Sequence, residues 1–117
     1  MKENVVQVKT YNFALRIVKC SQHLREDCKE FVLSKQLLRS GTSVGANVEE
    51  AIGAQSRRDF VAKLSISYKE ARETHYWLRL LGDAGIMDDN LQISTLKDCD
   101  EVLKIIGSIL KTTKANA

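Results

Sequence analysis

The sequence predicts an all-α protein, an antiparallel up-down-up-down four-helix bundle in a single domain. Three observations predict this fold class. The 117 residues include no proline, the residue that most strongly interrupts helices. Apolar residues recur at spacings of three and four along four segments. The connections between these segments are short, which favours antiparallel neighbours. A chain of this length forms one domain, here residues 1–117.

The first helix is predicted over residues 6–25, with two adjacent apolar stripes. The stripes are Val8, Tyr11, Leu15 and Val18, and beside them Ala14, Ile17, Ser21 and Leu24. Asp27 and Glu30 then have the spacing of a capping box, in which the two side chains satisfy free amides at a helix start. The second helix is therefore predicted over residues 28–54.

A run of small residues between positions 39 and 51 lies inside this second helix. Gly41 and Gly45 are one helical turn apart, which allows another backbone to approach closely. The partners expected for them are small residues of the third helix, namely Ser67, Ala71 and Thr74. A phosphate-binding loop is the alternative, but Ala46 and Asn47 stand where that motif requires a lysine and a hydroxyl. The run thus predicts helix packing.

Capping residues delimit the last two helices. Ser56 begins a third helix predicted over residues 57–83, which glycines end. Asp88 or Asp89 caps a fourth helix, predicted over residues 89–113.

Charges on the third predicted helix separate into two flanks around an apolar seam. At 100° per residue, one flank is acidic with apolar neighbours and the other is basic. The proposed members are Ile66, Glu70, Glu73 and Trp77 on the acidic flank, and Arg58, Lys69, Arg72 and Arg79 on the basic flank. The basic residues are candidate phosphate contacts, and the acidic flank is a candidate subunit interface. A solvated face with charges for solubility is the simpler alternative.

Composition favours an ordinary globular protein of the cytoplasm. The formal net charge is +3, but residues 1–82 hold 14 Lys and Arg against 9 Asp and Glu. Any cationic surface is therefore expected on the first three helices. The sequence has neither a run of about 18 apolar residues nor a signal-peptide pattern, so no membrane association is expected.

Motif content indicates neither a cofactor nor an active site. Cys20, His23 and Cys28 are possible metal ligands, but the three cysteines have no paired Cys-x-x-Cys spacing, and no metal is predicted. The Glu-x-x-His pairs of di-iron bundles are absent. No nucleophile, base and oxyanion donor can be named together, so the chain is predicted not to be an enzyme.

Several segments together carry a family resemblance. They are residues 35–40, 43–51, 69–74 and 76–78, with Phe60. In this combination the chain resembles, over residues 6 to 112, the bacterial four-helix bundle proteins encoded in 23S rRNA intervening sequences. Five residues, Arg39, Gly41, Gly45, Asn47 and Glu50, lie in the family's second-helix motif, whereas Glu70 and Glu73 match its third.

The resemblance implies a homopentameric ring with no known enzymatic activity. Similarity extends to the accessory variability determinant proteins of diversity-generating retroelements, which are basic pentameric bundles that bind nucleic acid and a reverse transcriptase. The leading functional hypothesis is a non-enzymatic oligomer that binds RNA or DNA through its basic flank. The alternative is a protein-interaction scaffold without nucleic-acid binding, in which that flank pairs with Glu70 and Glu73 of the neighbouring subunit.

Overall fold

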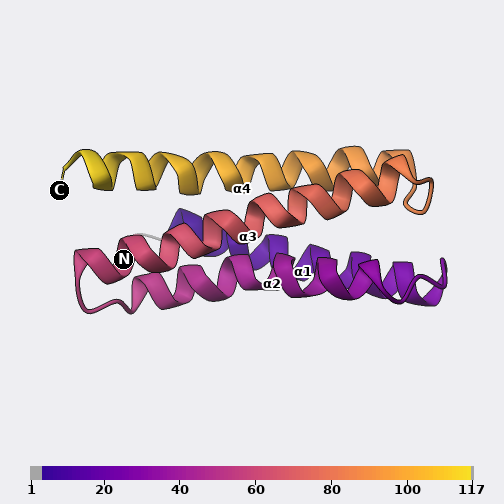
Figure 1. The fold of residues 1–117 in the computed structure, drawn as a ribbon, viewed down its shortest axis with the longest axis horizontal. Helices are drawn as coiled ribbons and strands as arrows, with labels where there is room; N and C mark the ends of the chain where they lie inside the picture. The colour runs from indigo at the N-terminus through magenta and orange to yellow at the C-terminus, as the bar shows by residue number, and fades with distance from the viewer. Residues whose placement is uncertain (1–3, 117) are drawn as a thin grey trace.

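The computed structural model describes residues 4–116, and this part of the chain folds into four α-helices without strands. The helices are α1 (Val5–Glu26), α2 (Leu33–Ile52), α3 (Arg57–Asp83) and α4 (Asp89–Ala115). They alternate in direction, each packs on the next, and α4 returns to contact α1 (Figure 1). The prediction of an all-α four-helix bundle is confirmed. Residues 1–3 and 117 of the predicted domain lie outside the described residues.

Side-chain caps explain where three of the helices begin. The Asn4 side chain accepts a hydrogen bond from a first-turn amide of α1, and Ser56 Oγ does the same for α3 at 3.0 Å. The Asp88 carboxylate accepts two amides of α4. These caps satisfy N–H groups that have no partner within the helix. The predicted limits of these three helices differ from the observed limits by at most two residues.

The second helix begins at Leu33, so the predicted start at residue 28 is wrong. Asp27 does not cap this helix, because its own amide still bonds to His23 at the end of α1. Lys29 adopts a left-handed backbone with φ of 55°, which interrupts any helix there. The Glu30 carboxylate caps α2 instead, by accepting three successive amides at 3.3, 3.0 and 2.7 Å, those of Val32, Leu33 and Ser34.

The core runs along the axis of the bundle and draws on all four helices. From α1 it takes Val6, Phe13, Ile17, Cys20 and Leu24. The predicted stripe through Val8 is therefore not the buried one, since Tyr11 and Leu15 are 61% and 47% exposed. Only the stripe beside it, through Ile17 and Leu24, points between α2 and α4.

Gly41 and Gly45 pack against α1, not against α3 as predicted. A Cβ on Gly41 would lie 2.5 Å from Ile17 Cγ2, and one on Gly45 would lie 3.2 Å from the Thr10 carbonyl oxygen. The small residues of α3 meet a different face of α2, since Ser67 donates to the Val44 carbonyl at 2.7 Å and the Thr74 and Ser40 hydroxyls lie 2.9 Å apart. Because α2 lies between α1 and α3, one face of α2 packs against α1 and a different face packs against α3.

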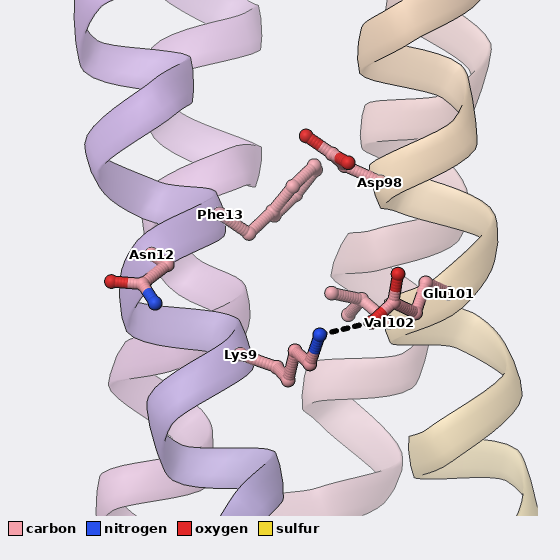
Figure 2. Close-up of a pocket in the computed structure, with 6 residues that line it drawn as sticks. All are labelled: Lys9, Asn12, Phe13, Asp98, Glu101 and Val102. Carbon is pink, nitrogen blue, oxygen red and sulfur yellow. Dashed lines mark ion pairs between the residues drawn. The ribbon is translucent and has the colours of Figure 1, made fainter.

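A shallow groove separates α1 from α4, and ion pairs bridge it. Figure 2 shows Lys9 of α1 reaching Glu101 of α4 beside Phe13 and Val102. Two turns further along α1, Arg16 pairs with Asp98 of α4. These partly exposed pairs link α1 and α4, which make the least extensive contact of the helix pairs that touch.

Candidate nucleic-acid interface

The four predicted phosphate-contact residues all lie exposed on α3. They are Arg58, Lys69, Arg72 and Arg79. Because α2 and α4 cover two sides of α3, these side chains take the third side, which faces solvent. Within residues 4–116 none of them forms an ion pair. The structure thus brings the basic flank together on one face, without a direct salt bridge to any acid of the described residues.

A groove between α3 and α4 lies beside this face. It has a volume of about 360 Å³ and is lined by Tyr68, Arg72, His75, Arg79 and Leu103. Arg79 Nε donates to His75 Nδ1 at 3.0 Å, while His75 Nε2 lies 3.0 Å from a carboxylate oxygen of Asp100. A single neutral tautomer with its proton on Nε2 satisfies both contacts. Asp100 thereby orients His75, and His75 orients Arg79.

Sequence reasoning missed this chain of contacts, because Asp100 comes from α4. The four-residue spacing from His75 to Arg79 along α3 was a usable signal for their contact. No local pattern indicates that an acid of another helix faces the same imidazole.

An exposed aromatic ring belongs to the same face. The Arg79 guanidinium carbon lies 5.8 Å from the ring centroid of Tyr76, which is 47% exposed. The neighbouring Trp77 ring meets that of Tyr76 edge-on, with centroids 5.0 Å apart. A tyrosine held between an arginine and a second ring offers a surface on which a base can stack.

The acidic flank is occupied within the subunit by Arg39 of α2. Its guanidinium pairs with Glu70 at 3.2 Å and also with Glu73. Trp77 Nε1 donates to the same Glu73 oxygen at 3.0 Å. The hydrogen bond from Trp77, together with Arg39, lowers the pKa of Glu73 against the opposing effect of burial. Three of the four residues predicted as an interface, Glu70, Glu73 and Trp77, take part in these contacts. The fourth, Ile66, takes no part in them and stays partly exposed.

The residues of the second-helix motif have mainly structural roles. Arg39 forms ion pairs with the carboxylates of the acidic flank, and the two glycines allow α1 to pack closely against α2. The Asn47 amide donates to the Ser43 carbonyl one turn earlier at 2.9 Å. Glu50 is exposed, and nothing in the structure explains its place in the motif.

Among residues 4–116 no group of three or more His, Cys, Asp or Glu residues is placed to hold a metal ion. None of the helices in that range combines the length and the apolar character needed to cross a membrane.

Comparison with known proteins gives a family match and a close structural match. A family model described as 23S rRNA-intervening sequence protein matches residues 2–108. A crystal structure of a protein of unknown function, from the S23 ribosomal protein family of Bacteroides thetaiotaomicron, superposes with a TM-score of 0.89. The two chains are 49% identical, and the match covers 91% of this chain and 98% of the other. The search of curated proteins gives no match.

Proposed function

The chain belongs to the 23S rRNA-intervening sequence protein family, and on that premise we propose that it is a non-enzymatic protein that binds RNA or DNA. One observation carries the proposal. Arg39 neutralises Glu70 and Glu73, while the cations on the outer face of α3 have no acidic partner among the described residues. Hereafter the outer basic face means Arg58, Lys69, Arg72 and Arg79.

The proposed mechanism is phosphate binding with release of counterions. Each phosphate neutralised by a Lys or Arg contributes roughly 0.7 to 0.9 to the slope of log affinity against log salt concentration. The outer basic face offers no fixed amides or carboxylates that would read base edges, so affinity is expected to depend little on sequence.

Self-assembly would strengthen a weak face of this kind. The family resemblance implies a homopentameric ring, which would present five copies of the outer basic face. Repeated weak contacts on one strand raise the overall affinity without any new contact, provided that the geometry allows simultaneous engagement. The exposed side chains of Tyr11 and Leu15 on α1 supply apolar surface suited to a contact between subunits.

A salt titration tests the proposed function. Binding of a fluorescent RNA strand and of a duplex is measured by anisotropy over a salt series, for the wild type and for the variant with Ala at all four positions of the outer basic face. We expect binding at low salt that the variant loses, with a correspondingly smaller slope. Two double variants give a matched comparison. Lys69→Ala with Arg72→Ala removes two charges from the outer basic face. The control, Lys19→Ala with Lys35→Ala, removes the same charge from exposed positions of α1 and α2.

The result can overturn the proposal in two ways. No binding at low salt would exclude nucleic acid as the ligand. Equal losses in the two double variants would show that net charge acts without any defined face.

A protein-interaction scaffold is the second candidate function. The observation that favours it is the apolar character of the α1–α2 surface, where Tyr11 and Ala14 adjoin Thr42 and Ala46 along a shallow groove. Such a surface suits another subunit or a protein partner such as a reverse transcriptase. Native mass spectrometry compares the wild type with the double variant Tyr11→Glu, Leu15→Glu. Together with the binding titration, it distinguishes the scaffold from the nucleic-acid-binding protein. A scaffold loses its assembly in this variant and binds no nucleic acid in either form.

A further inference from the structure

The connection from α1 to α2 brings a cysteine, a histidine and an aspartate together. His23 Nδ1 lies 2.7 Å from Asp27 Oδ2, and Cys28 Sγ lies 3.8 Å from His23 Nε2. The aspartate therefore meets one ring nitrogen and the thiol meets the other. This is the order of nucleophile, base and orienting carboxylate found where side chains activate a thiol.

The backbone of the connection holds the three side chains in register. The amides of Asp27 and Cys28 both donate to the His23 carbonyl, at 2.9 and 3.4 Å. The left-handed Lys29 then turns the chain, and the Glu30 amide returns to the Leu24 carbonyl at 2.9 Å. The thiol is thus fixed beside the imidazole by a closed turn.

Accessibility sets Cys28 apart from the other two cysteines. Cys28 is exposed, whereas Cys20 and Cys99 are buried. Burial raises the pKa of Cys20 to about 11 and that of Cys99 to about 12, which keeps both as thiols at neutral pH. Any reaction of the folded protein with a thiol reagent is therefore confined to Cys28.

The base of this cluster is open to solvent. His23 is exposed and lines a groove between α1 and α4 whose other lining residues are Arg16, Lys19, Cys20 and Leu91. Arg16 is paired with Asp98 of α4, and Asp27 is the acid in contact with the imidazole ring. A small reagent can therefore approach the imidazole from this side.

We propose that Cys28 is a reactive thiol that exchanges with small disulfides, with His23 as its base and Asp27 as the residue that positions His23. The Cys28 thiol gives its proton to His23 Nε2, and the thiolate attacks one sulfur of the disulfide. The sulfur–sulfur bond of the reagent breaks, and the departing thiolate takes the proton from His23. Cys28 ends oxidised in a mixed disulfide, and one half of the reagent is released as a reduced thiol.

Rate measurements with oxidised glutathione test this proposal. The full-length protein is incubated with the disulfide over a pH series, and intact and digested mass spectra follow modification at Cys28. In the wild type we expect reaction to persist well below the ordinary thiol pKa of about 8.5. We expect His23→Gln to slow it roughly fivefold near pH 7 and to give a single ionisation close to that ordinary value. Cys28→Ser should take up no glutathione while folded.

A matched pair of variants tests the positioning role. Asp27→Asn and Glu26→Gln each remove one carboxylate from an exposed site in this region, but only Asp27 contacts the imidazole. Only the first should shift the pH profile toward that of His23→Gln. Identical profiles for the wild type and His23→Gln would overturn the proposal, as would modification at Cys20 or Cys99 before Cys28. Equal effects of Asp27→Asn and Glu26→Gln would refute the role of Asp27.

Discussion

Arg39 and Glu73 pair across the contact between α2 and α3, and Glu70 joins the same guanidinium. The contact gives both carboxylates of the acidic flank a partner within the same chain. One arginine from the glycine-containing helix meets both carboxylates, and Trp77 completes the set by donating to Glu73. The four cations of the outer basic face, by contrast, form no ion pair within residues 4–116.

A charge exchange at this pair distinguishes intrachain from intersubunit pairing. We expect Glu73→Lys to lower the free energy of unfolding by about 1 kcal/mol, because it places like charges together at a half-exposed site. Arg39→Glu in the same chain should restore part of that loss, whereas Arg72→Glu should not. Urea denaturation measures the stability, and native mass spectrometry measures the assembly.

The opposite pattern would favour the scaffold. If Arg72→Glu rescues the assembly of Glu73→Lys and Arg39→Glu does not, Glu73 pairs between subunits. Glu26→Lys is a suitable control, because Glu26 is an exposed acid of α1 that forms no ion pair within residues 4–116.

Alanine substitutions at three glycines test the packing of the helix that carries the family motif. Gly41→Ala should destabilise the protein by about 1 to 3 kcal/mol, since its Cβ would overlap the fully buried Ile17. The Cβ of Gly45→Ala would lie 3.2 Å from the carbonyl oxygen and 3.4 Å from the carbonyl carbon of Thr10, so the cost of a small shift and the gain in helix propensity should roughly cancel. Gly107→Ala is the control, because its Cβ would meet Tyr68 at an ordinary 3.4 Å, and it should stabilise. Thermal and urea unfolding measure the order of stability of the three variants.

A stability for Gly41→Ala equal to that of Gly107→Ala would contradict the close approach of α1.

The features that could be predicted depend on neighbours in sequence. Helical periodicity and caps such as Ser56 act over three or four residues, so the four helices and most of their limits follow from local patterns. The exposure of the four basic residues followed in the same way, because helical position separated them from the apolar seam.

The features that were missed depend on which helices become neighbours. Both faces of α2 carry small residues, so the direction of Gly41 could not be chosen without the position of α1. The pairing of Arg39 with Glu73 and the contact of Asp100 with His75 likewise join different helices. The false cap at Asp27 has another cause, because two carboxylates three residues apart both fit a helix start and only the left-handed Lys29 decides between them.

The cap of α2 has a pH dependence with a definite sign. Burial acts to raise the pKa of Glu30, but hydrogen bonds from the amides of Leu33, Ser34 and Val32 outweigh it and hold the pKa below its usual value. A lowered carboxylate pKa stabilises the fold above the unfolded-state pKa of about 4.3, and the contribution is lost as the pH falls through the folded-state value. Glu30→Ala should therefore cost about 1 kcal/mol at neutral pH and progressively less in acid.

Urea denaturation at several pH values checks this prediction. Glu26→Ala removes an exposed acid one turn earlier and should show little pH-dependent difference from the wild type. A cost of Glu30→Ala that does not change between neutral and acid pH would mean that the carboxylate charge contributes nothing to the cap.

The contact between His75 and Arg79 separates positioning from charge in nucleic-acid binding. His75→Ala removes the acceptor that orients Arg79 and leaves the cations of the outer basic face in place. We expect a loss of affinity of roughly twofold to fivefold, the cost of ordering one free arginine side chain, with the salt slope unchanged. Arg79→Ala should instead lower the slope by roughly 0.7 to 0.9, because one phosphate contact disappears. Anisotropy titrations over a salt series measure both quantities. A slope reduced equally by the two substitutions would show that His75 itself contacts phosphate as a cation, and that Arg79 does not depend on it for its orientation.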